Sequence, residues 1–294
     1  MNKITISYIS IILLFLILAN CNHDDGVSDS LKIASYNIRY KAPEDKESGN
    51  KWEKRKDPLA KIIKNNNIDI VGTQEGDSLQ MEDLSSLLPG YDYIAYPYGS
   101  TRKNGSHIHT ASILYKVSDF EILKEGRFWY SETPDEESIG WDATDLRICA
   151  WAKMKHKSSG QKFYFFTSHF YWRKHIAKEN SGRVMVEKIK EIADEDLPII
   201  STGDLNSEIG SSQITDITHY LQDARNITKE SPIGPKNTNL GGGNFKDPPK
   251  NRIDYIFVNK KVQVLTYSVL TDNYDDGRYP SDHLPVVCDI ILEK

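Results

Sequence analysis

Polar side chains that are unusual inside β-strands recur at the ends of short apolar segments. They are Asn37 in SYNIRY, Glu75 in GTQEG, His169 in TSHF, Asp204 and Asn206 in GDLNSE, Asp254 in RIDYIF, and Asp282 with His283 in YPSDHLPV. Carboxylate and amide oxygens bind hard divalent cations, and histidine exchanges a proton near neutral pH. Because six segments share this pattern, we interpret these residues as functional rather than as a coincidence.

Each of these residues also has a purely structural explanation. Asn37 could close a turn, Asp204 with Asn206 could form an Asx turn, and Asp282 could cap the segment that follows it. Asp282 and His283 are adjacent, and neighbouring side chains of a strand point to opposite faces. We therefore expect Asp282 and His283 to have different partners rather than to form a pair.

Short segments rich in β-branched and aromatic residues must position these side chains. Strands are predicted over 31–38, 68–74, 91–97, 111–116, 147–154, 162–170, 197–205, 252–258 and 284–292. The spacing of apolar residues between them predicts helices over 53–66, 76–88 and 174–194, the second capped by Asp77 or Ser78. Dominant strands with intervening helices favour two packed sheets covered by helices.

Two zones of the sequence are rich in loop-forming residues, 131–146 and 228–251. The second contains SPIGPKN, LGGG and DPPK and lies between segments that carry the polar residues above. Long loops in such places often select a substrate, and we expect that role here.

Length and composition describe an ordinary globular chain. Its 294 residues fit one large domain or two small ones, with 38% hydrophobic and 27% charged residues. The formal net charge is −5, so the chain lacks the excess of positive charge that is typical of a non-specific nucleic-acid binder. Basic clusters at 51–56, 100–105 and 171–174 are interpreted as solvated surface.

The N-terminus has the pattern of an export signal. Lys3 precedes the uncharged apolar segment 4–19, which is shorter than the roughly 20 residues of a spanning helix and suits a signal peptide. Cys21 in LANC resembles a bacterial lipobox cysteine. We predict a lipoprotein signal peptide over 1–20, a tether over 21–30 and one domain over 31–294.

The lipid on Cys21 would anchor an exported, periplasmic or cell-surface monomer to the membrane. A plain secretory signal or a membrane anchor is the alternative, and each of these interpretations exports the protein. Loss of residues 1–20 removes only Lys3 among charged residues and changes the formal net charge from −5 to −6. Cys149 and Cys288 then remain, as one disulfide or two buried free thiols.

The ordered motifs resemble those of one superfamily. SYNIRY, QEG, GDLNSE, RIDYIFV and SDHLPV look like the endonuclease/exonuclease/phosphatase superfamily, and FWYSETP with GWDATDLRICAWAKM resembles an exported bacterial branch of it. The resemblance covers the chain from about residue 31 to 292. It implies the deoxyribonuclease-I-like fold, a four-layer α/β sandwich of two mixed β-sheets flanked by helices.

The resemblance also implies a site that uses Mg²⁺ or Mn²⁺. Glu75 would be the chief metal ligand, assisted by Asn37 and Asp282 directly or through water. Asp204 would orient or deprotonate the attacking water, and Asn206 would hold that water or a phosphate oxygen. A cation and hydrogen-bond donors offset the negative charge that repels a nucleophile from a phosphate ester.

Histidines and arginines complete the implied site. His283 would be a general base or a phosphate contact oriented by Asp254, since a carboxylate on one imidazole nitrogen fixes the tautomer. Arg39 and Arg147 match positions that contact phosphate, and a surface ion pair is the alternative for each.

His169 lies in a segment that departs from the superfamily pattern. Thr167 and Tyr171 replace the usual asparagine and aspartate, and His109 stands where relatives often carry glutamate. The resemblance implies an acid or a phosphate clamp at His169, with its protonation state open. A transition-metal site of His107, His109 and His169 is an alternative.

The leading hypothesis is an exported, metal-dependent phosphoesterase that hydrolyses mono- or diesters by in-line attack of an activated water. Nuclease, phosphodiesterase and phosphatase activities all fit the motifs, and the acidic charge favours small phosphoesters, nucleotides or lipid headgroups over long nucleic acid. The alternative is a non-catalytic surface lipoprotein that binds phosphorylated ligands, motivated by the altered partners of His169.

Overall fold

Two mixed β-sheets form the centre of the protein, described here by a computed structural model over residues 30–99 and 108–293. The predicted signal peptide, Cys21, residues 21–29 of the tether and His107 lie outside the described residues.

The first sheet has six strands in the order β11-β12-β1-β2-β4-β3. These are β1 (Leu31–Asn37), β2 (Ile70–Gln74), β3 (Tyr91–Tyr98), β4 (His109–Lys116), β11 (Val262–Val269) and β12 (Val286–Leu292). Strands β1 and β2 are parallel, and the other neighbours are antiparallel. Asn37 and Glu75 therefore come to the same edge of this sheet.

The second sheet also has six strands, in the order β5-β6-β7-β8-β10-β9. These are β5 (Phe120–Trp129), β6 (Ile148–His156), β7 (Lys162–His169), β8 (Ile199–Asp204), β9 (Gln222–Asp223) and β10 (Asp254–Val258). Strands β7 and β8 are parallel and pair His169 with Asp204, while antiparallel β10 places Asp254 opposite Asp204.

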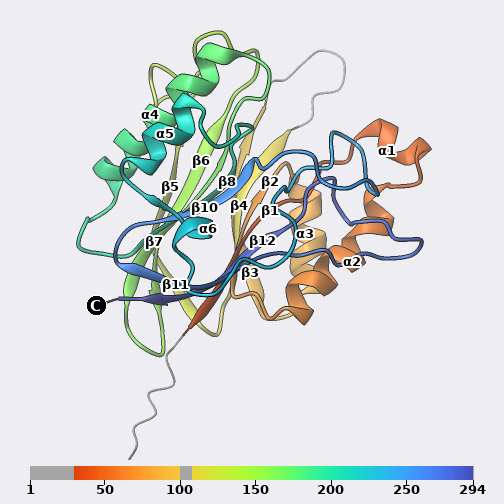
Figure 1. Cartoon of the computed structure of the whole chain (residues 1–294), viewed down its shortest axis with the longest axis horizontal. Coiled ribbons are helices and arrows are strands. Elements are labelled where there is room, and N and C mark those ends of the chain that lie inside the picture. Colours follow the sequence, from red (N-terminus) through yellow and green to blue (C-terminus); the bar gives the residue numbers. More distant parts are fainter. Residues whose placement is uncertain (1–29, 100–107, 294) are drawn as a thin grey trace, which may run out of the picture.

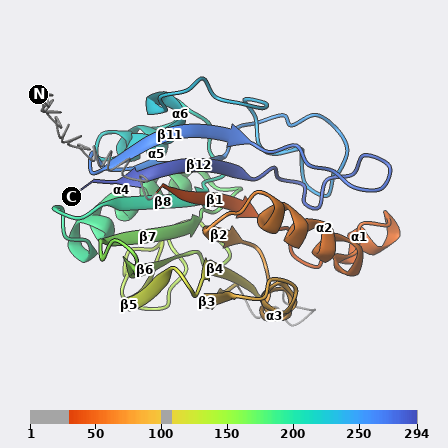
Figure 2. The ribbon, with the colours of Figure 1, turned by 90° about the horizontal axis from the view of Figure 1, so that it is seen from below.

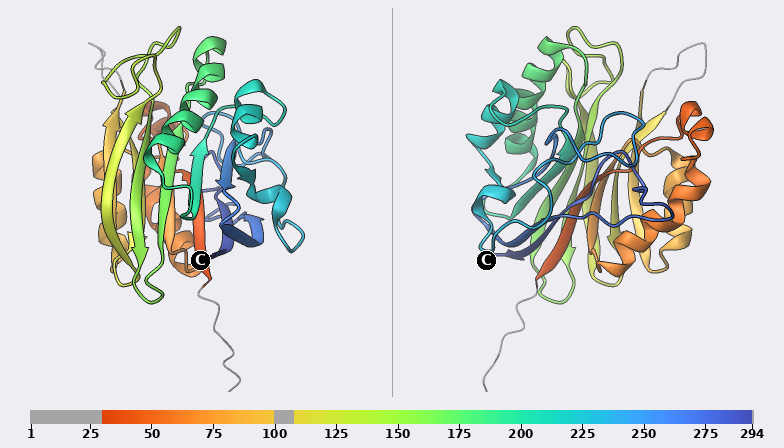
Figure 3. Two further views of the ribbon diagram at one scale, coloured as in Figure 1. Left: turned by 90° about the vertical axis from the view of Figure 1, so that its left-hand side faces the viewer. Right: turned by 45° about the vertical axis from the view of Figure 1, so that its right-hand side comes forward.

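Helices cover the outer faces of both sheets (Figures 1 and 2). The first sheet carries α1 (Pro43–Glu47), α2 (Trp52–Asn65) and α3 (Ser78–Leu87), and the second carries α4 (His175–Ile192) and α5 (Ser212–Thr218), with the short α6 (Ala224–Ile227) beside β10. One apolar cluster fills the space between the sheets, and two others lie under the helices. This four-layer arrangement, also visible in Figure 3, confirms the predicted fold.

The predicted segments match nine of the twelve described strands and the three longest helices, and Asp77 caps α3 through a capping box with Gln80. The sequence missed β5, β9 and β11, which are all edge strands. In β5 most residues between its ends are exposed or half-buried, so its sequence lacks the apolar run that marks a central strand.

The structure also describes the two cysteines and the apolar character of the helices. Cys149 and Cys288 lie in different sheets as buried free thiols, so of the two possibilities left open the unpaired one holds. Among the described residues, none of the helices combines the length and the apolar character needed to span a membrane.

The two sheets lie close together at Gly72 of β2. A Cβ there would lie 2.8 Å from the Thr167 hydroxyl oxygen and would overlap that of Thr202. Close by, the Gln74 amide donates to the Thr167 hydroxyl at 2.9 Å and so links the sheets. Glycine at position 72 thus lets β2 approach β7 and β8 of the other sheet.

We predict that Gly72→Ala destabilises the protein by about 1–3 kcal/mol, because its Cβ overpacks the interface between the sheets. Chemical denaturation measures the change. Gly242→Ala is the control, since its Cβ would meet nothing within 4 Å, and a change below about 0.5 kcal/mol is expected. Equal stability of Gly72→Ala and the wild type would contradict the close approach.

Candidate active site

Strand ends from both sheets meet at one buried polar cluster. The Asn37 amide nitrogen donates to Glu75 Oε1 at 3.1 Å and to Asp204 Oδ2 at 2.9 Å. Glu75 follows β2 of the first sheet, whereas Asp204 ends β8 of the second. Asn37 therefore connects the two halves of the site by direct hydrogen bonds.

The two carboxylate oxygens of Asp204 have different partners, one in the local backbone and the other in the site. Its Oδ1 accepts the backbone N–H of Asn206 at 3.0 Å, so the Asx turn exists, while Oδ2 faces Asn37 and lies 3.5 Å from His169 Nε2. Burial, partly opposed by the charge of His283, raises the pKa of Asp204 to about 7. Such a carboxylate can accept a proton near neutral pH.

Asn206 lies beside Asp204 but points its amide nitrogen elsewhere, donating to the Phe170 carbonyl at 3.0 Å. Its φ of 47° is in the left-handed region, as are those of Glu75 (69°) and Arg39 (54°). Such backbone conformations are costly for residues other than glycine and concentrate at functional sites.

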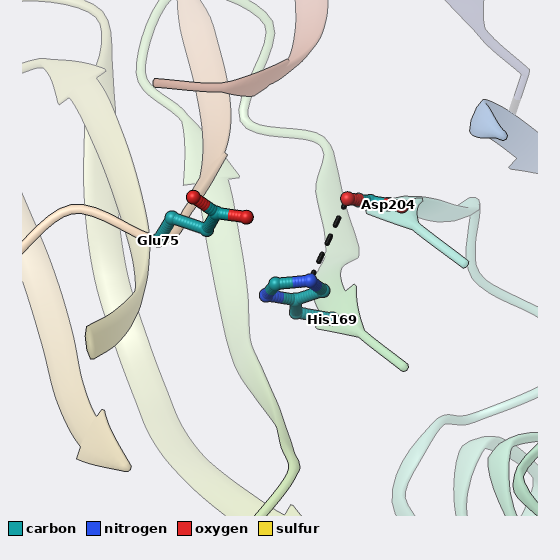
Figure 4. Close-up of side chains that lie close together, drawn as sticks. All are labelled: Glu75, His169 and Asp204. Atoms are coloured by element: carbon teal, nitrogen blue, oxygen red, sulfur yellow. Dashed lines mark ion pairs between the residues drawn. The ribbon is translucent and has the colours of Figure 1, made fainter. Parts of the chain in front are cut away.

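Glu75, His169 and Asp204 form one potential ligand group (Figure 4). One ligand atom from each lies within 4.8 Å of the others. Asp204, Asp254 and His283 form a second such group, so Asp204 belongs to both.

The predicted contact between His283 and Asp254 is present. His283 Nδ1 lies 2.9 and 3.1 Å from the two oxygens of Asp254, which also accepts the Thr238 hydroxyl at 2.6 Å. Asp282 has other partners, since its Oδ2 accepts the backbone N–H of Gly243 at 2.8 Å. Asp282 and His283 are thus separated, as their adjacency predicted.

The protonation of His283 follows from the charges around it. Burial alone would lower its pKa, but Asp254 and Asp204 raise the pKa well above its ordinary value. His283 Nε2 lies 2.8 Å from Asn239 Nδ2, an atom that can donate only to an unprotonated nitrogen. Protonated His283 therefore requires the Asn239 amide to present its oxygen instead.

Arg39 is buried among carboxylates, so it does not form the surface ion pair that was its alternative interpretation. Its Nε and Nη2 each lie 3.2 Å from an oxygen of Asp45, Nη2 also contacts Glu44, and Nη1 lies 3.4 Å from Asp282 Oδ2. Each guanidinium nitrogen therefore has a carboxylate partner. The group is buried rather than part of an exposed ion pair, and its contact with phosphate stays a prediction.

His169 contacts Arg147 and Tyr98 rather than a carboxylate through Nδ1. The Arg147 Nη1 lies 3.1 Å and the Tyr98 hydroxyl 2.7 Å from Nδ1. A guanidinium only donates, so Nδ1 must accept and the ring proton is on Nε2. Burial, followed by the charge of Arg147, lowers the pKa of His169 well below its ordinary value. His169 is therefore neutral.

The oxygen donors present fit a hard divalent cation. Asp282 Oδ1 is buried and has no hydrogen-bond partner within residues 30–99 and 108–293, and the nearby Glu75 carboxylate contributes to the raised pKa of Asp282 after the larger effect of burial. The Asn37 oxygen instead accepts the backbone N–H of Arg39 at 3.0 Å. A metal contact through that oxygen would require the Asn37 amide to turn over.

Several residues around the site lacked a sequence signal. Thr238, Asn239 and Gly243 belong to the loop predicted to select a substrate, yet they contact Asp254, His283 and Asp282. His109, predicted at a glutamate position, lies with Nδ1 2.9 Å from the Glu75 carbonyl. Tyr98 ends an aromatic strand, and its sequence gives no hint of a polar contact.

The interpretation of residues 51–56 as solvated surface is wrong for Arg55. Its side chain is completely buried and donates to the carbonyls of Asn50, Ile38, Pro280, Arg39 and Tyr40 at 2.7–3.1 Å. These carbonyls belong to the segments that follow Asn37 and precede Asp282. Arg55 therefore holds two site segments together from behind.

Comparisons with known proteins agree with this geometry. The sequence model of the Endonuclease/Exonuclease/phosphatase family matches residues 20–283. A mannosyl-6-phosphatase of Bacteroides thetaiotaomicron is 35% identical, with 90% of this chain and 100% of that chain covered and a TM-score of 0.80. A Bacteroides vulgatus protein of the same family is 32% identical, with 90% and 99% covered and a TM-score of 0.80.

More distant similarity extends to other organisms. The human Nocturnin catalytic domain with bound sulfate shares the fold at 20% identity, with 90% of this chain and 93% of that chain covered and a TM-score of 0.70. An uncharacterized protein of Acanthamoeba polyphaga mimivirus is 28% identical over 263 residues, which is 83% of this chain and 92% of that protein.

We predict that Arg55→Met lowers the free energy of unfolding by about 3–5 kcal/mol, because buried carbonyls and Asp45 lose their cationic partner. Chemical denaturation measures it. Arg183→Met is the matched control, since Arg183 is exposed on α4 and its change should stay below about 0.5 kcal/mol. Similar losses in both variants would argue against a special role for Arg55.

Proposed function

The chain belongs to the endonuclease/exonuclease/phosphatase family, and from that premise we propose that it is a divalent-metal-dependent hydrolase of phosphoric esters. The observation that carries the proposal is the convergence of Asp204, Glu75 and the His283–Asp254 pair on one buried cluster. Carboxylates of different pKa beside two differently protonated histidines are an arrangement suited to acid–base chemistry.

In the proposed reaction, Asp204 accepts the proton of the attacking water through Oδ2. The water oxygen bonds to phosphorus as the bond from phosphorus to the leaving oxygen breaks, and the leaving oxygen takes up a proton from solvent. His283, whose pKa is raised, carries a proton at neutral pH, which favours its role as a cationic phosphate contact over that of a base. Asp254 fixes its orientation.

Glu75 and Asp282 would hold the cation, Mg²⁺ or Mn²⁺, because both present carboxylate oxygens at the site and one oxygen of Asp282 has no partner among the described residues. When bound, the cation supplies positive charge that offsets the charge of the phosphate ester. Asn37 would assist only after its amide turned its oxygen toward Glu75.

For the substrate, we propose a phosphorylated sugar or a similarly hydroxyl-rich phosphomonoester. A mannosyl-6-phosphatase resembles the chain over that protein's full length. Next to Asn206, a depression of about 500 Å³ is lined by polar groups that include His175, Lys178, Glu179 and Asn251. Its donors and acceptors suit the hydroxyl groups of such a ligand.

Export with a lipid on Cys21 stays part of the proposal, as does a monomeric state. Strand β1 begins at Leu31 and ends in the site at Asn37, so its first residue lies at the opposite end of the sheet (Figure 1). An anchor before Leu31 would therefore attach at the end away from the site. That position favours substrates from the medium over lipids of the anchoring membrane.

We predict Mg²⁺-dependent release of phosphate from mannose 6-phosphate by the wild type, and little cleavage of bis(p-nitrophenyl) phosphate. Asp204→Ala should lose about 10²–10⁴-fold in kcat, because it lacks the proton acceptor. Asp216→Ala, an exposed position of α5, is the control. Binding of phosphorylated sugars without turnover of any ester in the presence of Mg²⁺ or Mn²⁺ would instead support the non-catalytic alternative.

We also predict that kcat/KM falls as the pH drops through a midpoint at or below about 7, the raised pKa of Asp204. Below that pKa the carboxyl carries a proton and cannot accept another, so the active form is lost on the acid side. A pH–rate profile from pH 5 to 9 measures it. The same acid limb in residual Asp204→Ala activity would exclude Asp204 as its source.

A further inference from the structure

Arg147 differs from the other buried arginines of the described chain. Arg39 and Arg55 lie near Asp45, and Arg252 forms a bidentate pair with Asp223 at 2.6 and 2.7 Å. Arg147 is only 7% exposed, yet no carboxylate within residues 30–99 and 108–293 lies within ion-pair distance of it. Its Nε is buried without a hydrogen-bond partner.

Two aromatic rings hold Arg147 instead. Its guanidinium carbon lies 5.6 Å from the ring centroid of Tyr98 and 5.6 Å from that of Tyr171. The Tyr98 hydroxyl is tied to His169 Nδ1, and the Tyr171 hydroxyl to Thr144 Oγ1 at 2.8 Å. Both rings are buried, so the two faces are fixed in place.

Ring faces attract a cation without cancelling its charge. A carboxylate in the position of either ring would neutralise Arg147, whereas the quadrupole of a tyrosine carries no net charge. A buried, uncompensated guanidinium is unfavourable unless an anion joins it. Tyr171 occupies the position where the superfamily pattern has aspartate, so this chain places an uncharged side chain beside Arg147.

We propose that Tyr98 and Tyr171 are positioning residues that hold Arg147 by their ring faces, so that its uncompensated charge binds the phosphate of the substrate together with the Nε2–H of His169. The inference rests on the proposed function for the identity of the anion as a phosphate ester. Arg147 and His169 are joined by the contact at Nδ1, which leaves Nε2–H directed toward Asp204.

Tyr171 is the better position to test, because Tyr98 also contacts His169. Tyr171→Phe keeps the ring and loses only the bond to Thr144. Tyr171→Met removes the ring at similar volume, and Tyr171→Asp puts a carboxylate beside Arg147. Titration calorimetry with inorganic phosphate, with and without Mg²⁺, gives Kd for each variant independently of turnover.

We expect Tyr171→Phe to bind phosphate within about 2-fold of the wild type. Tyr171→Met should weaken binding by about 3- to 30-fold, the range of a buried cation–π contact. Tyr171→Asp should weaken it at least as much. With a sugar phosphate as substrate, KM should rise more than kcat falls, as for a lost ground-state contact.

Unchanged phosphate binding in Tyr171→Met and Tyr171→Asp would overturn the inference, and so would equal losses in Tyr171→Phe and Tyr171→Met. If the variants that remove the ring do not fold, Arg147→Met provides the test, because it removes the guanidinium and leaves no buried charge at this position. Phosphate affinity equal to that of the wild type in Arg147→Met would also overturn the inference. Phosphate binding that depends on Tyr171 in a protein without turnover would support this inference and contradict the proposed function.

Discussion

The site depends on the close approach of the two sheets, and the hydrogen bonds of the Asn37 amide connect them. That amide donates to Glu75 from the first sheet and to Asp204 from the second within 3.1 Å. The bond to Asp204 runs from β1 to β8 and therefore requires the two sheets to pass close to each other, which Gly72 on the neighbouring strand β2 permits. Each sheet alone carries only half of the polar residues. Tertiary packing therefore creates the site, and the strands serve mainly to deliver residues to it.

Burial of so many charges is tolerated because most of them have specific partners. Arg39 is surrounded by Asp45, Glu44 and Asp282, and Arg55 is surrounded by backbone carbonyls. Hydrogen-bonded partners of this kind offset the cost of removing a charge from water. Among the described charged residues of the site, Arg147 and one oxygen of Asp282 are exceptions. The two exceptions have opposite charge and so suit an anionic ester and a cation respectively.

The sequence predicted those site residues that are marked by their position along a strand. Glu75, Asp204, Asp254 and His283 were identifiable as polar residues at the ends of apolar strands, and the resemblance to the superfamily implied the Asp254–His283 contact. Residues defined by distant contacts were not identifiable. Arg55 looked like surface because its acceptors, such as the Pro280 carbonyl, lie far away in sequence. Edge strands such as β5 were missed because one face is exposed.

The arrangement of charge also bears on the choice between an enzyme and a phosphate-binding protein. A protein that only binds phosphorylated ligands gains affinity from cations and N–H donors, and a buried carboxylate near the anion repels it. Here Asp204 lies 3.5 Å from His169 and 3.8 Å from His283, and burial raises its pKa to about 7. Glu75 and Asn206 adopt left-handed backbone conformations beside it. These features weaken simple anion binding, but they suit a group that must take a proton from water next to phosphorus, so the geometry favours catalysis.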